Sequence, residues 1–174
     1  MTEQVKRFLY VVVCASGVAD DVGKLIKLAQ DRGWDVGVIA TPNAIPLFDP
    51  QAVEAQTGYP IRSAWRTPDQ PRPLPPADAI AVAPATLNTI TKWADGHADT
   101  LALGSLTEAY GLGIPTVVLP YINSAQAAHP AYARSVEQLT AMGVRFGSYQ
   151  PHRPKAGGGR DHFDWTEALD LLDA

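Results

Sequence analysis

The chain has 174 residues, of which 46% are hydrophobic and 18% are charged, a composition typical of soluble globular domains. This length allows one domain with a substantial core, so we expect residues 1–174 to form a single domain. The formal net charge of −4 disfavours nucleic acid as the main partner, because contacts with phosphate groups require clustered lysine and arginine. No apolar stretch has the length of a membrane span, so no membrane association is expected.

The only cysteine, Cys14, lies inside the apolar run 8–14. A cysteine in a buried strand behaves as a small hydrophobic residue, so we expect it to have a structural role. A single cysteine forms no intramolecular disulfide, and residues 1–7 lack the apolar core of a signal peptide. These features favour a cytoplasmic protein.

Apolar runs alternate with longer helical patterns from the N-terminus onward. In chain order, we expect strands over residues 9–14, 35–40, 77–83, 114–119 and 144–146. Helices are expected over residues 18–32, 48–56, 90–96, 99–111 and 131–142, and a last helix begins near Asp164. Such alternation is typical of a mostly parallel sheet with helices on both faces. We therefore predict a three-layer α/β/α Rossmann-like domain of the flavodoxin-like type.

Local signals set several boundaries of these elements. Pro50 favours the start of the second helix, and Pro84 is expected to end the third strand. Asp164 and Glu167 have the spacing of a capping box at the last helix. The segment 65–76 is rich in proline, which favours an extended connection.

Four turns at the expected strand ends carry polar residues suited to ligand binding. The first turn joins strand 9–14 to its helix through Ser16 and Gly17. Gly17 permits close approach of a ligand to the backbone, Ser16 supplies a hydroxyl, and the helix N-terminus favours a phosphate. A plain strand-to-helix turn explains these residues equally well, since the full G-x-G-x-x-G pattern is missing.

The other three turns follow the second, third and fourth strands. Thr41 and Asn43 would lie beside the first turn in a parallel sheet, although turn chemistry alone also explains them. The turn after the third strand contains Thr86 and Asn88, and the turn after the fourth contains Asn123. Doubly wound proteins bind ligands at the carboxyl ends of parallel strands. We therefore expect these side chains to meet in one crevice.

Residues 84–89 read P-A-T-L-N-T, and residues 120–130 begin with P-Y-I-N and end with proline. These segments resemble the P-A-S-A-N-T and P-x-M-N-x-x-M-W-x-x-P motifs of the homo-oligomeric flavin-containing cysteine decarboxylases. That family includes phosphopantothenoylcysteine decarboxylase and the peptidyl-cysteine decarboxylases of lantibiotic biosynthesis. Residues 88–99 also keep the family's N-T-x-x-K-x-A-x-G-x-x-D spacing. The likeness extends in order over about residues 8–147 and includes the Ala-Ser-Gly turn, which makes it specific.

The resemblance implies a bound FMN, with its phosphate at the first two turns and its ring against the turn after the third strand. The implied FMN-binding residues are Ser16, Gly17, Thr41, Asn43, Phe48, Pro84, Ala85, Thr86 and Asn88. Asn123 would be the catalytic residue that contacts a carboxylate or amide of the substrate, with Tyr121 beside it. The resemblance also implies a homo-oligomer, a trimer or a dodecamer of trimers, with each flavin site between subunits.

Two segments depart from the family pattern. The family uses a histidine shortly before the third strand as a base, whereas residues 69–76 contain none. Neither Gln70 nor Arg72 suits general-base chemistry near neutral pH. The later loop 151–161 is rich in glycine and lacks the cysteine of the phosphopantothenoylcysteine enzymes. We expect this loop to be flexible, with Arg160 available to hold a substrate carboxylate.

We predict a flavoprotein that performs FMN-dependent redox or decarboxylation chemistry on a small molecule with a carboxylate or thiol, or on a peptide C-terminus. The missing histidine leaves a non-catalytic flavin carrier or regulatory subunit as an alternative. A flavin prenyltransferase-like enzyme is a further alternative, because such proteins share the fold and the Ala-Ser-Gly turn. The remaining candidates for a base are His97, His129, His152 and His162. No metal site is expected, because the sequence offers no ligand spacing for one.

Overall fold

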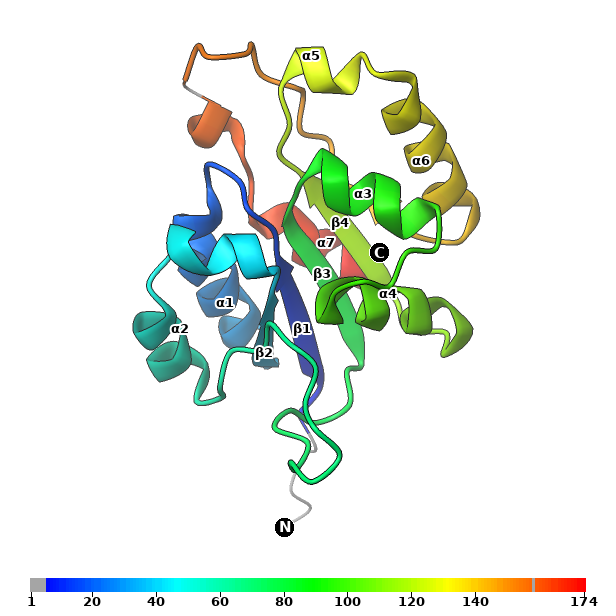
Figure 1. Cartoon of the computed structure of the whole chain (residues 1–174). Helices are drawn as coiled ribbons and strands as arrows, with labels where there is room; N and C mark the ends of the chain where they lie inside the picture. The colour runs from blue at the N-terminus through cyan, green and yellow to red at the C-terminus, as the bar shows by residue number, and fades with distance from the viewer. Residues whose placement is uncertain (1–5, 158) are drawn as a thin grey trace.

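The computed structural model describes residues 6–157 and 159–174. Its sheet contains five parallel strands in the order β2-β1-β3-β4-β5 (Figure 1). The strands are β1 (Phe8–Val13), β2 (Asp35–Ala40), β3 (Ala79–Ala85), β4 (Thr116–Pro120) and β5 (Arg145–Phe146). The first four form on short, largely apolar runs, as strands of buried parallel sheets do, whereas β5 is a half-buried pair of residues at the edge of the sheet. The strand order is that of flavodoxin-like folds, so the predicted fold class is confirmed.

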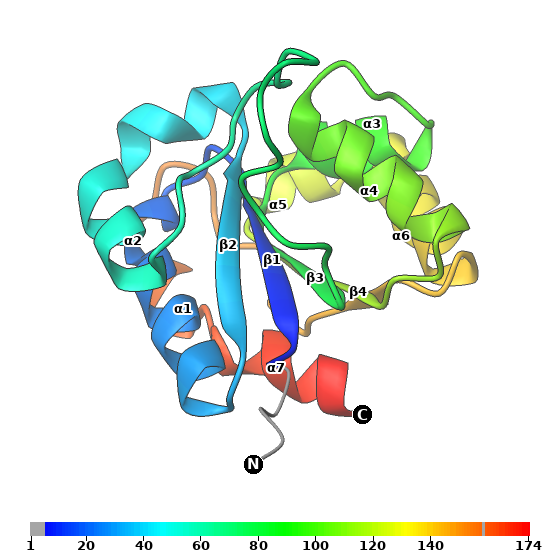
Figure 2. The same cartoon turned by 90° about the horizontal axis from the view of Figure 1, so that it is seen from below.

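Helices cover both faces of this sheet, as Figure 2 shows. The α-helices are α1 (Val22–Asp31), α2 (Pro50–Thr57), α3 (Leu87–Ala94), α4 (Leu101–Gly111), α5 (Ser124–Ala127), α6 (Pro130–Ala141) and α7 (Thr166–Asp173). Short 3₁₀ turns form η1 (Ala19–Asp21), η2 (Pro42–Leu47) and η3 (Gly159–His162). The helices α1, α2 and α7 pack on one face, and α3, α4 and α6 pack on the other. Among the described residues, every helix is too short or too polar to cross a lipid bilayer.

Side chains that alternate along β1 supply both hydrophobic cores. Leu9, Val11 and Val13 belong to the core beneath α1, α2 and α7. Val12 and Cys14 belong to the core beneath α3, α4 and α6. All five are completely buried. A strand that is buried on both faces must be apolar throughout, and this is why its sequence predicts it so directly.

The strand β3 runs further than the sequence predicts. It continues through Pro84, whose peptide bond with Ala83 is cis, to Ala85. The register of the β3–β4 ladder shifts between Val82 and Ala85, so the missing N–H of Pro84 falls where the ladder is already interrupted. The carbonyl of Pro84 still accepts a hydrogen bond from the Cys14 N–H at 3.1 Å. The prediction that proline ends this strand is therefore wrong.

The helix α7 starts without the predicted capping box. The Asp164 carboxylate accepts from the N–H of Thr166 at 2.9 Å, two residues further on. The Glu167 carboxylate accepts from the N–H of Ser148 at 2.8 Å. Glu167 therefore ties α7 to the segment that follows β5 instead of closing its own helix.

The proline-rich connection 65–76 contains neither helix nor strand. Leu74 lies over Gly37 in β2, and Trp65 lies over Gly104 in α4, where the glycines leave room for these side chains. Between the connection and α4 lies a cleft of about 610 Å³, near the amino ends of the strands. None of the residues that line this cleft belongs to the four polar turns.

Candidate functional site

The carboxyl edge of the sheet brings the predicted turns together. Three backbone hydrogen bonds join neighbouring segments there: Thr41 N–H to Val13 C=O at 2.9 Å, Cys14 N–H to Pro84 C=O at 3.1 Å, and Tyr121 N–H to Ala85 C=O at 2.9 Å. The order of the strands therefore places the first turn between the turns after β2 and β3. This is the crevice where doubly wound folds bind their ligands.

The first turn contains polar groups without a hydrogen-bond partner in the part of the chain that the structure describes. The Ser16 hydroxyl oxygen is buried and has no hydrogen-bond partner among the described residues. The N–H groups of Gly17 and Val18 have no acceptor in residues 6–157 and 159–174 either. A buried hydroxyl without a partner costs about 1–3 kcal/mol. This turn therefore fits a ligand that accepts several hydrogen bonds, such as a phosphate.

Gly17 is not required by the backbone conformation of this turn. Its φ angle is not among the positive ones, and a Cβ built on it would lie 3.5 Å from Cε1 of Tyr121, an ordinary contact distance. Neither strain nor protein packing explains a glycine here. Close approach of a ligand to the backbone, the role predicted from the sequence, remains the interpretation that accounts for it.

The turn after β2 presents Thr41 and Asn43 but not Phe48. Thr41 is half-buried and its side chain caps no helix, while Asn43 is exposed at the start of η2. Phe48 is only 8% exposed and packs in the core with Val53. Leu47, the preceding residue, is 44% exposed. Because Phe48 packs in the core, its side chain is poorly placed for the predicted contact with the flavin ring. Leu47 is the exposed side chain of the two.

The turn after β3 combines buried apolar residues with polar caps. Pro84 and Ala85 are buried within β3, and Asn88 is exposed. Thr86 caps α3 by accepting from the Thr89 N–H at 3.4 Å, and so the helix starts at Leu87, earlier than predicted. The predicted ring-facing turn thus consists of a rigid strand end followed by the N-terminus of α3.

Cys14 lies directly beneath this turn. Its thiol donates to the Thr89 hydroxyl at 3.3 Å and is completely buried. Burial raises the pKa of the Cys14 thiol above its ordinary value, although hydrogen bonds from Thr89 and Thr86 oppose the shift. The thiol is therefore neutral near pH 7, in agreement with the structural role predicted for it.

The turn after β4 holds Asn123 in a fixed orientation. The Asn123 side-chain oxygen accepts from the Gln126 N–H at 2.9 Å and caps α5. Its NH₂ group has no acceptor among the described residues, so it is free to donate to a carboxylate. Tyr121 precedes it and is half-buried.

An aromatic cluster that the sequence did not reveal lies beside Asn123. The Tyr121 ring is 4.6 Å from the ring of His152, 5.3 Å from Tyr149 and 5.6 Å from Phe163, measured between centroids. Asn123 and His152 also form an isolated parallel β-bridge. Of the four histidines, His152 is thus the one that stacks on Tyr121 and pairs with Asn123.

The His152 ring is held by a tyrosine hydroxyl. Its Nδ1 lies 2.9 Å from the hydroxyl oxygen of Tyr149. Burial raises the pKa of Tyr149 to about 12, and the nearby Tyr121 adds to the shift, so this hydroxyl stays protonated. In contrast, His129 caps α6 through Nδ1, which accepts from the Ala131 N–H at 3.1 Å. The members of the aromatic cluster lie in loops or far apart along the chain, so the periodicity of the sequence does not reveal their contacts.

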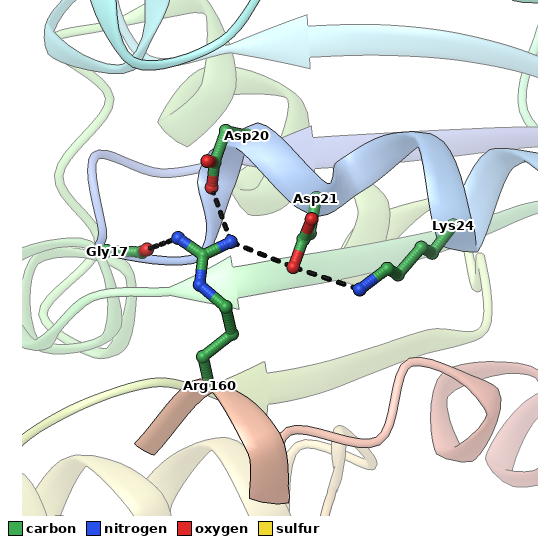
Figure 3. A network of polar contacts seen from close by, with 5 residues as sticks. All are labelled: Gly17, Asp20, Asp21, Lys24 and Arg160. Atoms are coloured by element: carbon green, nitrogen blue, oxygen red, sulfur yellow. Dashed lines mark hydrogen bonds and ion pairs between the residues drawn. The ribbon is translucent and has the colours of Figure 1, made fainter. Parts of the chain in front are cut away.

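The Gly-rich loop folds back onto the first turn instead of leaving Arg160 free. Arg160 pairs with Asp20 at 2.9 Å and Asp21 at 2.8 Å, and it donates to the Gly17 carbonyl at 2.6 Å (Figure 3). The guanidinium is therefore engaged by other groups of the protein. The sequence-based expectation that it is available to hold a substrate carboxylate does not match this arrangement. Gly158, part of the loop predicted to be flexible, lies outside the described residues.

The segment that carries a histidine in the family is engaged in a local turn. Gln70 is exposed, and its side-chain oxygen accepts from the Thr67 N–H at 3.1 Å. Arg66 in turn donates to the Gln70 carbonyl at 2.8 Å. Gln70 thus stabilises the proline-rich connection and carries no group that takes up a proton near neutral pH.

Comparison with known proteins identifies the family of this chain. Residues 1–159 match the sequence model of the Flavoprotein family. The chain belongs to this family. It is 31% identical over 129 residues to the coenzyme A biosynthesis bifunctional protein CoaBC of Thermococcus kodakarensis, and 34% identical over 124 residues to the phosphopantothenoylcysteine decarboxylase of Mus musculus. The resemblance predicted from residues 84–89 and 120–130 is confirmed.

Structural likeness extends over nearly the whole flavoprotein. The FMN-dependent cysteine decarboxylase SpaF has a TM-score of 0.71 at 26% identity, over 97% of this chain and 98% of that one. TvaF, a cysteine decarboxylase of thioviridamide biosynthesis, has a TM-score of 0.75 at 20% identity over 97% and 99%, and shares the fold. The two curated relatives are longer: the alignments cover 70% and 67% of this flavoprotein but 32% and 60% of those proteins.

Proposed function

We propose that this flavoprotein binds FMN at the carboxyl edge of its sheet. The single observation that carries the proposal is the buried hydroxyl of Ser16, which lacks a partner among the described residues beside two backbone N–H groups without acceptors. The phosphate would accept from Ser16, Gly17 and Val18, with Thr41 and Asn43 beside it. The ring would lie against residues 84–88, which end β3 and begin α3.

We further propose that the protein acts on a small molecule with a carboxylate or thiol, or on a peptide C-terminus. The flavin, when bound, supplies redox chemistry by accepting a hydride or electrons. Asn123 would orient the substrate by donating its NH₂ group to a carboxylate, while its oxygen remains bonded to the Gln126 N–H. The protein would thereby exploit a side chain whose orientation is already fixed before substrate binds.

The first test is the visible spectrum of the purified protein. We expect absorption bands of bound flavin, and a colourless protein should take up one FMN per chain on titration. A protein that stays colourless and takes up no FMN contradicts the proposal. Ser16→Ala should bind FMN more weakly, whereas Ser63→Ala, in the connection after α2 (Pro50–Thr57), should bind it like the wild type.

The second test separates the cap of Asn123 from its contact with substrate. Asn123→Asp keeps an oxygen for the Gln126 N–H but replaces the NH₂ donor with a negative charge. We expect FMN binding to persist and carbon dioxide release from a cysteine-terminated peptide or 4′-phosphopantothenoylcysteine to fall about 100-fold or more. Equal turnover in wild type and Asn123→Asp would remove Asn123 from the reaction.

A non-catalytic flavin-binding subunit is the second candidate, and the position of Gln70 favours it. The residue is exposed and bonded to Thr67 in its own loop, so the family's base has no counterpart there. Tight flavin binding without turnover of either substrate, together with association with an enzyme, would support this candidate. The prenyltransferase-like alternative has less support, because Arg160 is already paired with Asp20 and Asp21.

We also propose that the protein is a cytoplasmic homo-oligomer, a trimer or an assembly of trimers. Trp65, Tyr110 and Leu112 are large apolar side chains that are 58%, 63% and 70% exposed. Trp65 and Leu112 line the same cleft, and contiguous exposed apolar surface is typical of faces that are covered in an assembly. Light scattering after size-exclusion chromatography tests the state, and a monomer at micromolar concentration would contradict it.

A further inference from the structure

We propose that Arg160 is a positioning residue for the phosphate of the bound flavin, an inference that rests on the proposed FMN site. Its guanidinium joins three groups of the first turn and of η1 in one fork (Figure 3). One terminal nitrogen donates to Asp20 at 2.9 Å and to Asp21 at 2.8 Å. The other terminal nitrogen donates to the Gly17 carbonyl at 2.6 Å.

The contact with Gly17 sets the direction of a backbone donor. In a trans peptide the C=O and the following N–H point in opposite directions. Because Arg160 holds the Gly17 carbonyl, it turns the Val18 N–H away from itself. That N–H has no acceptor among the described residues, like the buried Ser16 hydroxyl two residues earlier. Arg160 therefore holds the turn on one side, and the donors of the turn face a ligand on the opposite side.

The contacts with Asp20 and Asp21 remove an electrostatic obstacle. Both carboxylates lie close to the first turn, since one guanidinium reaches them and the Gly17 carbonyl together. Two unpaired negative charges at this distance would repel a phosphate. With Lys24, which pairs with Asp21 at 3.1 Å, Arg160 makes the group formally neutral. The helix N-terminus can then attract an anion.

The experiment compares two flavins that differ only in the phosphate. FMN and riboflavin are titrated into wild-type protein and Arg160→Gln, and dissociation constants are measured by flavin fluorescence quenching. We expect Arg160→Gln to weaken FMN binding roughly tenfold, which corresponds to about 1.4 kcal/mol, and riboflavin binding less than about twofold. Arg160→Lys keeps the positive charge but lacks the forked donor geometry, so its FMN affinity should lie between those of the wild type and Arg160→Gln.

Arg32→Gln is the matched control. Arg32 also pairs with two carboxylates, Asp170 at 2.7 Å and Asp173 at 3.0 Å, but at the other end of α1. Its loss should leave the ratio of FMN to riboflavin affinity unchanged even where it lowers stability. The triple variant D20N/D21N/R160Q should recover most of the FMN affinity lost in Arg160→Gln, because the unpaired carboxylates are gone.

The outcomes separate this inference from the proposed function. Wild-type protein that binds neither flavin overturns both. Wild-type protein that binds FMN, with the same FMN-to-riboflavin ratio in Arg160→Gln, overturns the inference alone. An equal loss of both ligands in Arg160→Gln would also overturn it, since it would mark a general structural role. If Arg160→Gln does not fold, the ratio is measured on Arg160→Lys, and an unchanged ratio there has the same meaning.

Discussion

The two ends of the parallel sheet carry different kinds of surface. The amino end has a cleft of about 610 Å³ between the proline-rich connection and α4, lined by Trp65 and three arginines. The carboxyl end has four polar turns, a buried hydroxyl without a partner in the described residues and a helix start beside it. The family motifs lie at the carboxyl end, whereas the segment that lacks the family's histidine lies in the connection at the amino end.

The difference lies in what the polar groups at each end require, since a larger cavity of about 930 Å³, lined in part by Tyr149, His152 and Gly159, borders the carboxyl-end site as well. The cleft at the amino end is a product of how residues 65–76 cross the sheet, with Leu74 and Trp65 seated on glycines. The carboxyl end is defined instead by donors for which the described residues provide no acceptor. Unsatisfied donors raise the free energy of the ligand-free protein, and a ligand that accepts from them removes this cost. An apolar cleft does not by itself require a ligand in this way.

The largest expected effect is that of Gly159→Ala at the carboxyl end. A Cβ at Gly159 would lie 2.5 Å from the Tyr149 hydroxyl, 2.8 Å from the Tyr121 hydroxyl and 3.0 Å from Cγ of His152. Overpacking of this kind costs about 1–3 kcal/mol. Urea denaturation should therefore show a lower free energy of unfolding, and FMN affinity should fall as the loop moves. Unchanged stability would mean that the aromatic cluster yields easily.

Ser16→Ala should have opposite effects on stability and binding. The variant removes a buried hydroxyl that has no partner in the described residues, so the flavin-free protein should gain about 1 kcal/mol or more. FMN affinity should fall about tenfold, since one hydrogen bond to the phosphate is lost. Thermal unfolding with and without FMN measures both. A destabilised flavin-free variant would show that the hydroxyl serves the fold.

A smaller effect is expected from the acid titration of Asp21. Burial raises the pKa of Asp21, but hydrogen bonds from Lys24 and Arg160 outweigh it and hold the pKa below 3.8. The stabilising contribution is therefore present above pH 3.8 and is lost as the pH falls through the lower, folded-state pKa. Solvent screening keeps it to about 1 kcal/mol or less. Between pH 5 and pH 2, the free energy of unfolding measured by urea denaturation should fall less for Asp21→Asn than for the wild type.

Gly104→Ala at the amino end should have the smallest effect. Its Cβ would displace the far end of the exposed Trp65 side chain, which can swing aside. Alanine also favours a helix over glycine by about 1 kcal/mol. We expect unchanged FMN affinity, a change of less than about 1 kcal/mol in stability and a shift in tryptophan fluorescence. A loss comparable to that of Gly159→Ala would mean that both ends are equally constrained.

The sequence predicts the strands well because the sheet is buried on both faces. Residues 35–40 are apolar almost throughout, and the predicted strand matches β2 residue for residue. The strand β3 is predicted to end two residues too early, because its passage through Pro84 depends on an irregularity in the β3–β4 ladder. Such a register shift is a property of two strands together and leaves no local pattern.

The predicted site is assembled in part by contacts that no local pattern encodes. The four turns are predictable, since each follows an apolar run, and the sheet order brings them together. The contacts of Arg160 with Asp20 and Gly17 join residues about 140 positions apart. His152 reaches Asn123 through an isolated β-bridge. These contacts depend on the path of the loop, which its glycines leave open.

The packing of α7 shows that the folded unit extends beyond the segment that matches the family. The match ends at residue 159, yet Ala168 and Leu169 are completely buried against β3 and β4. Arg32 and Arg160 also connect α1 and η1 to the segment beyond that point. A fragment cut at residue 159 would expose one wall of its sheet to solvent. We expect it to aggregate, so the smallest piece for expression or crystallisation includes α7.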